Sequence, residues 1–148
     1  AGPDGSAMTA LTKHNAPLLQ ALDLPPAERF TFAGAEGDRV SGWLFRPPGF
    51  DPSRKYPVLF LIHGGPQGAW HDEWHNRWNY AMFAAPGYAL VAINPRGSTG
   101  YGQRFVEMNR GDWGGGDFKD VMAGGDWLVA RGIADPNRLG IGGWSDGG

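Results

Sequence analysis

The chain has 148 residues, a hydrophobic fraction of 41% and a formal net charge of -2. This length fits about one domain, the apolar content indicates a packed core rather than disorder, and the small negative charge excludes a broad basic surface for nucleic acid. No apolar run reaches membrane-spanning length, so neither nucleic acid nor a membrane is an expected partner. Cysteine is absent, which excludes disulfides, thiol nucleophiles and thiolate metal sites and leaves the compartment open.

Residues 1–27 are mixed in character and predict a connecting segment with one short helix, in which closely spaced leucines precede two prolines. Alternating apolar and polar residues then predict two half-buried strands, at residues 30–32 and 40–45. The glycine-containing stretch of residues 34–38 between them is typical of a hairpin turn. We therefore expect the folded region to begin with two antiparallel strands.

Two continuous apolar runs, at residues 57–62 and 88–93, predict strands buried on both faces, as in the parallel part of an α/β sheet. Between these runs, large apolar side chains recur every four residues from Trp70 to Met82. That spacing predicts a helix over residues 70–85 with an apolar stripe on one face. The expected order is strand, helix, strand.

A second helix is predicted because Asp117 can cap its start and apolar residues recur at near-helical spacing over residues 118–129. Gly132 is placed to end this helix. A turn at residues 135–137 and a short apolar strand at residues 138–142 follow. Two antiparallel strands followed by alternating strands and helices indicate the α/β fold class, of which this chain holds the first part.

The chain closes with Gly143-Trp144-Ser145-Asp146-Gly147-Gly148, which contains Gly-x-Ser-x-Gly directly after the predicted strand. In this pattern a serine lies on a tight, strained turn that holds its hydroxyl out from the sheet. The residues at Gly143 and Gly147 must then be small. The pattern therefore predicts a nucleophile elbow with Ser145 as the nucleophile.

A serine nucleophile also needs hydrogen-bond donors that stabilise the oxyanion formed when it attacks a carbonyl. The sequence His63-Gly64-Gly65-Pro66 follows the first buried strand, where the backbone of a glycine-rich loop supplies such donors in many hydrolases. We interpret it as an oxyanion loop rather than as a plain Gly-Pro turn.

Two rival sites fit their patterns poorly. His71 and His75 stand four residues apart on the predicted first helix, but Asp72 occupies the position where the zinc-peptidase pattern requires glutamate. A solvated polar face explains this pair better. The glycine-rich residues 111–116 lack the Gly-Lys-Ser/Thr of a phosphate-binding loop. We therefore expect no metal and no other cofactor.

Four motifs occur in a fixed order along the chain. They are Tyr56-Pro57-Val58-Leu59-Phe60-Leu61-Ile62-His63-Gly64-Gly65-Pro66, then Asn94-Pro95-Arg96-Gly97-Ser98-Thr99-Gly100-Tyr101-Gly102, then Gly111-Asp112-Trp113-Gly114-Gly115, and finally the elbow. Together they resemble the catalytic domain of prolyl oligopeptidase family serine peptidases, in particular the dipeptidyl-peptidase V and acylaminoacyl-peptidase branch. The resemblance spans residues 28–148 and implies the N-terminal part of an α/β-hydrolase domain that ends at the elbow. It also implies an upstream β-propeller, with residues 1–27 as the connection.

The resemblance further implies roles for individual residues. Ser145 would be the nucleophile, the backbone N–H groups of Gly65 and Asp146 would form the oxyanion hole, and the triad aspartate and histidine would lie in the C-terminal remainder of the domain. Asp146 stands where this branch usually carries tyrosine, and a carboxylate there should disfavour a nearby oxyanion. No histidine of this chain is expected to replace the missing base; the four are His14, His63, His71 and His75.

The expected function is a serine peptidase that acts on peptides through an acyl-enzyme on Ser145, as dipeptidyl- and acylaminoacyl-peptidases do. A carboxylesterase is one alternative, and an inactive fragment that only associates with the missing half of the domain is another. We expect Arg96 to hold its own loop rather than contact substrate, and Trp144 to pack under the elbow. Because the elbow strand is central in this fold, the chain alone should expose an unpaired strand edge and an apolar face.

Overall fold

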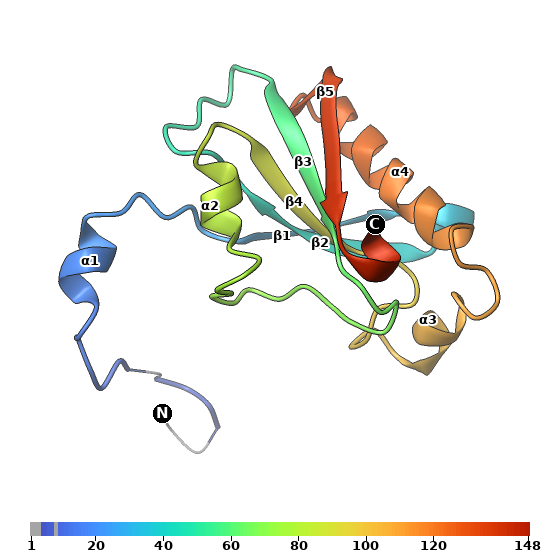
Figure 1. Ribbon diagram of the computed structural model, residues 1–148, viewed down its shortest axis with the longest axis horizontal. Coiled ribbons are helices and arrows are strands. Elements are labelled where there is room, and N and C mark those ends of the chain that lie inside the picture. Colours follow the sequence, from blue (N-terminus) through green and yellow to red (C-terminus); the bar gives the residue numbers. More distant parts are fainter. Residues whose placement is uncertain (1–3, 8) are drawn as a thin grey trace.

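The computed structural model describes residues 4–7 and 9–148. A five-stranded sheet forms the centre of the molecule, and α1 lies apart from it on an extended N-terminal segment (Figure 1). The strands are β1 (Glu28–Ala33), β2 (Arg39–Phe45), β3 (Tyr56–Ile62), β4 (Ala89–Asn94) and β5 (Ala134–Gly143). The helices are α1 (Ala16–Gln20), α2 (Tyr80–Ala84), α3 (Gln103–Glu107) and α4 (Gly116–Ala130), with short 3-10 turns η1 (Ala35–Gly37) and η2 (Ser145–Gly147). Among the described residues, no helix is long and apolar enough to cross a membrane.

The order of strands across the sheet is β1-β2-β4-β3-β5. As predicted, β1 and β2 form an antiparallel hairpin. β2 also pairs antiparallel with β4, whereas β3 lies parallel to both β4 and β5. The parallel strands therefore bring their C-terminal ends, and the loops that follow β3, β4 and β5, to one edge of the sheet.

Both faces of β3 and β4 are packed, as their continuous apolar runs predicted. On β3, Val58 and Phe60 belong to the cluster that packs against α4, while Leu61 belongs to the cluster that packs against α2. This alternation follows from the two-residue period of a strand. The site at the end of β3 thus stands on a strand that is fixed from both sides.

Helix α4 confirms the second predicted helix, although its start differs in detail. Gly115 is the N-cap residue, and Asp117 lies in the first turn, where its carboxylate accepts from the N–H groups of Gly114 and Phe118 at 3.2 and 2.7 Å. Gly132 follows the helix with a φ of +73°. The negative charge of Asp117 stabilises the helix start, as a capping side chain would, because the first N–H groups of a helix have no partner within the helix.

The long helix predicted over residues 70–85 is wrong, because only α2 is helical there. Trp70 is buried, but Trp74 and Met82 are 63% and 71% exposed, so the apolar stripe does not form one packed face. The indole N–H of Trp70 donates to the carbonyl of Leu61, and its backbone N–H donates to Asn94 Oδ1. These long-range hydrogen bonds hold Trp70 in an irregular segment that the local spacing does not reveal.

Strand β5 lies at the edge of the sheet beside α4 (Figure 1). Within the described residues it pairs only with β3, and its side chains Leu139 and Ile141 are 44% and 63% exposed. The expectation of an unpaired strand edge and an uncovered apolar face is confirmed.

Candidate active site

The elbow forms where β5 ends and η2 begins. Ser145 has a φ of +62°, a left-handed conformation that is costly for a residue with a side chain. A Cβ atom at Gly143 would overlap the carbonyl oxygen of Gly147, and one at Gly147 would overlap the carbonyl oxygen of Ile62. The prediction that both positions must be small is confirmed, and the close backbone packing explains how the strained serine is held.

The loop after β3 meets this elbow. A methyl group at Gly64 would lie 2.8 Å from the carbonyl oxygen of Trp144, 3.2 Å from Ser145 Cβ and 3.8 Å from Ser145 Oγ. Among the described residues, the backbone N–H groups of Gly65 and Asp146 donate to no acceptor. The fold therefore brings the predicted oxyanion loop against the serine and leaves two N–H groups available for a ligand.

Ser145 opens into a cleft of about 400 Å³. Its walls are the glycine loop and large side chains, namely Ile62, His63, Gly64, Gly65, Trp70, Arg77, Trp78 and Trp144. Trp144 is 72% exposed here, so the prediction that it packs under the elbow is wrong. It forms part of the wall of the cleft.

His63 is buried, and both of its ring nitrogens have partners. Nδ1 lies 3.0 Å from the carbonyl oxygen of Gly64, and Nε2 lies 2.8 Å from Ser98 Oγ. Burial lowers the pKa of the imidazole, while the Gly64 carbonyl and the charge of Asp146 act more weakly in the opposite direction. Both ring nitrogens of His63 are therefore engaged within the two loops. No described side chain forms a hydrogen bond with Ser145 Oγ.

The other histidines of the cleft region do not form a metal site. His71 and His75 lie in irregular chain, not on a helix, and Nδ1 of His75 accepts from the backbone N–H groups of Arg77 and Trp78 at 3.1 and 2.9 Å. No group of three histidine, aspartate or glutamate side chains that could hold a metal ion occurs within residues 4–7 and 9–148.

Arg96 holds its loop, as predicted. Its guanidinium forms a buried ion pair with Asp120, with Nε 3.0 Å from Oδ2, and donates to the carbonyl oxygen of Ala35 at 2.7 Å. Asp120 is fully buried and also accepts from the backbone N–H groups of Arg96 and Ala35. Sequence reasoning missed Asp120; the available signal was its spacing of four residues from Gly116 and from Gly124, which are buried on the same face of α4.

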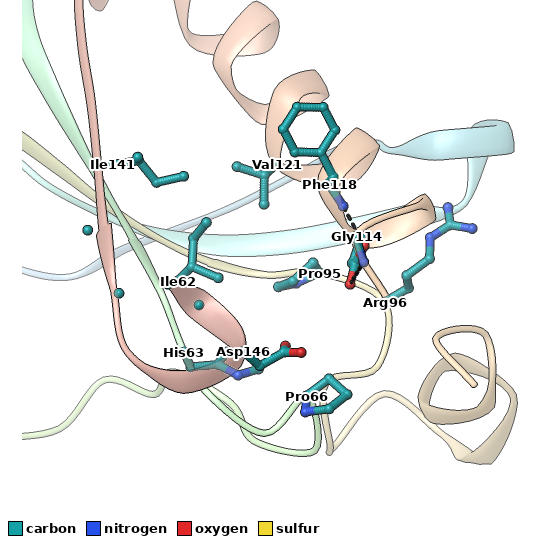
Figure 2. Close-up of a pocket in the computed structure, with 15 residues that line it drawn as sticks. Ile62, His63, Pro66, Pro95, Arg96, Gly114, Phe118, Val121, Ile141 and Asp146 are labelled. Carbon is teal, nitrogen blue, oxygen red and sulfur yellow. Dashed lines mark hydrogen bonds between the residues drawn. The ribbon is translucent and has the colours of Figure 1, made fainter. Parts of the chain in front are cut away.

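Asp146 lies over a second hollow, of about 330 Å³, between the elbow and the start of α4 (Figure 2). Apolar side chains of the sheet and of α4 line much of this hollow; Ile62, Phe118, Val121 and Ile141 are among them. Burial raises the pKa of the Asp146 carboxyl, the charge of Asp117 raises it further, and His63 opposes the shift. The carboxylate form of Asp146 is thus electrostatically disfavoured.

A strained serine between a parallel strand and a turn, beside a glycine loop from the neighbouring strand, is the geometry predicted for a nucleophile elbow in the α/β-hydrolase fold. The model of the prolyl oligopeptidase family matches residues 74–148, which is half of the chain. The chain belongs to this family.

Known relatives agree with that assignment. The chain is 50% identical to dipeptidyl-peptidase 5 of Schizosaccharomyces pombe over 101 residues. This matched region covers 68% of this chain and 15% of that protein. Among solved structures, the acylaminoacyl peptidase of Pyrococcus horikoshii matches 93% of this chain and 22% of its own with a TM-score of 0.80 and 30% identity. A puromycin-hydrolyzing peptidase of Mycobacterium tuberculosis matches 83% of this chain and 19% of its own with a TM-score of 0.75 and 32% identity. The chain thus spans a minor part of the length of its relatives.

Proposed function

We propose that the protein is a serine peptidase in which Ser145 forms the acyl-enzyme. The observation that carries this proposal is the meeting of a left-handed Ser145 with two unpaired N–H groups, those of Gly65 and Asp146. Ser145 Oγ attacks the carbonyl carbon of the scissile bond and gives its proton to a base, and the leaving amine departs with a proton. Water then attacks the acyl-enzyme, releases the acid and restores the serine.

The two N–H groups would stabilise the oxyanion formed in both steps. Loss of one such donor typically costs about a hundredfold to a thousandfold in turnover. Gly65 suits this task because its backbone has a φ of +143° and a Cβ there would overlap the N–H of Gln67. The loop therefore offers bare backbone to the substrate next to Ser145.

The base and acid of the triad belong, in this proposal, to the C-terminal remainder of the catalytic domain. The exposed Leu139 and Ile141 on β5 support this arrangement, because a further part of the domain would bury them. We assign residues 28–148 to the catalytic domain and residues 1–27 to the connection from an upstream β-propeller. The share of 15% of a dipeptidyl-peptidase 5 supports a protein of several times this length.

The proposed substrates are peptides, from which the enzyme removes dipeptides or blocked residues at the N-terminus. This specificity rests on the names of the relatives, since dipeptidyl and acylaminoacyl peptidases both occur among them. The elbow and glycine loop would serve esters equally well, which keeps a carboxylesterase as the second candidate.

The test compares three substrates in the full-length protein: a dipeptidyl coumarylamide, an N-acetyl-aminoacyl coumarylamide and a short p-nitrophenyl ester. We expect amide hydrolysis that S145A abolishes and that S53A, at an exposed turn before β3, does not change. Ester hydrolysis without amide hydrolysis would support the esterase instead. Amide hydrolysis that survives in S145A would refute the role of Ser145.

A further inference from the structure

Two buried polar residues beside the elbow have no role in the proposed chemistry. Ser98 is fully buried and His63 is 7% exposed. They come from different loops, His63 from the one after β3 and Ser98 from the one after β4, and their side chains are in contact through Nε2 and Oγ at 2.8 Å. This contact ties the glycine loop to the neighbouring loop, which the ion pair of Arg96 and Asp120 anchors to α4.

The hydrogens in this contact can be placed by counting donors and acceptors. The Gly64 carbonyl only accepts, so its bond with His63 requires a hydrogen on Nδ1. In the neutral ring Nε2 then accepts from the Ser98 hydroxyl; in the charged ring Nε2–H donates to Ser98 Oγ, whose hydrogen passes to the Pro95 carbonyl 2.6 Å away. The neutral form with the hydrogen on Nδ1 leaves the Pro95 carbonyl without the Ser98 hydrogen, so only the charged ring satisfies all three contacts at once. A ring with its hydrogen on Nε2 alone would lose the bond to the Gly64 carbonyl, so that bond exists only in the forms that carry a hydrogen on Nδ1.

The bond from Nδ1 to the Gly64 carbonyl sets the direction of the next N–H group. The peptide between Gly64 and Gly65 is trans and planar, so its carbonyl and its N–H point in opposite directions. When the carbonyl faces the His63 ring, the N–H of Gly65 faces away from it. Gly64 itself lies against Ser145, which places this N–H at the elbow.

We propose that His63 and Ser98 are positioning residues, which hold the Gly64–Gly65 peptide so that the N–H of Gly65 is aimed at the oxyanion. The proposal rests on the function proposed above, in which Gly65 is an oxyanion donor. Neither side chain touches the substrate in this account. Their effect passes through the orientation of one peptide plane.

A substitution at Gly68 gives an independent test of the hydrogen bond between His63 Nδ1 and the Gly64 carbonyl. The N–H of Gly68 donates to the Pro66 carbonyl, and a methyl group at this position would lie 2.9 Å from the Gly64 carbonyl oxygen and 3.2 Å from His63 Nδ1. These distances are shorter than ordinary van der Waals contact, so the methyl group would push the peptide plane or the ring. G68A thus disturbs the orientation without removing any polar group.

The experiment measures kcat, KM and the rate of fluorophosphonate labelling of Ser145 in full-length S98A, S98T, G68A and S41A. Ser41 is a matched control, because it is also buried and its hydroxyl donates to Tyr101 Oη at 2.7 Å rather than to His63. We expect S98A and G68A to lower kcat and the labelling rate at least tenfold, as a partial loss of one oxyanion donor would, with KM changed less than twofold. S98T, which keeps the hydroxyl, should recover most of the loss, and S41A should keep the kcat of the parent.

Wild-type kcat in both S98A and G68A would overturn the proposal. Equal losses in S98A and S98T would also overturn it, since they would point to packing rather than to the hydroxyl. Where S98A does not fold, G68A decides by the same criterion. S145A separates the two levels: full turnover in S145A refutes the proposed function, whereas an inactive S145A with normal S98A and G68A refutes only the positioning role.

Discussion

The elbow and the loops that face it are held in place by different forces. The elbow has no side-chain hydrogen bond at the start of η2, and its shape depends on backbone packing around Gly143 and Gly147. The loop after β4 depends instead on buried polar contacts, which include the ion pair of Arg96 and Asp120. One region should therefore fail when volume is added, and the other when a polar partner is removed.

The largest effect is expected from added volume at the elbow. In G143A and G147A the new methyl group overlaps a backbone carbonyl oxygen, so the serine must shift, and a displacement of this order costs about a hundredfold or more in kcat/KM. G140A and G142A are matched controls on the same strand, because a Cβ there has its nearest neighbour at 3.7 and 3.8 Å. Kinetics on a peptide amide substrate check this. Activity within threefold of the parent in G143A would contradict the claim that backbone packing around this glycine positions the serine.

The next effect concerns the polar region. D120N leaves the Arg96 guanidinium buried beside a neutral partner and should lower the free energy of unfolding by about 3–5 kcal/mol, as broken buried ion pairs do. Urea unfolding of the catalytic domain measures it. The control is D38N, which breaks the ion pair with the exposed Arg104 and should leave the urea midpoint unchanged. Equal midpoints for D120N and D38N would contradict the role given to the buried pair.

A smaller effect is expected at Asp146, where the two regions meet. D146N removes a negative charge next to the proposed oxyanion hole and should raise kcat about threefold to tenfold at neutral pH. Because burial and Asp117 raise the pKa of Asp146 above its ordinary 3.8, its carboxyl is protonated up to a higher pH than usual. The gain should therefore be full above that pKa and shrink as the pH falls through it. A pH profile of kcat for D146N and the parent measures this gain. A lower kcat in D146N than in the parent at neutral pH would contradict the prediction.

The smallest effect is expected at Trp74, which lies in the irregular segment after the glycine loop. W74A should change the free energy of unfolding by less than about 0.5 kcal/mol, because the side chain is mostly exposed. Its counterpart W70A removes a buried indole that donates to the Leu61 carbonyl and should cost about 3–5 kcal/mol. Urea unfolding of the two variants measures the difference in the free energy of unfolding. Similar losses would indicate that both indoles are packed, as the predicted helical stripe required.

The features that sequence reasoning predicted correctly are those with local causes. The apolar runs of β3 and β4 identify strands wherever they lie in the fold, and Gly143 must be small because of the backbone of Gly147, four residues later. The same holds for α4 and for Gly132 after its end. In each case the residues that set the structure are neighbours in sequence.

The features that sequence reasoning missed depend on distant partners. Trp70 has the spacing of a helical stripe, yet Asn94 and Leu61 hold it in an irregular loop. Trp144 lies within the elbow motif, but its exposure depends on what the rest of the fold places beside it. Ser98 carries no mark in the sequence, and the spacing of Asp120 indicates its face of α4 but not its partner Arg96, because these contacts form only when segments far apart in sequence meet.

The most direct test of the account is to locate the site of acylation in the full-length protein. Treatment with a fluorophosphonate, followed by intact mass and peptide mapping, should show one adduct per catalytic domain, on Ser145. S145A should remain unlabelled under the same conditions. An adduct on another serine, or labelling that persists in S145A, would contradict the assignment of this elbow as the nucleophilic centre.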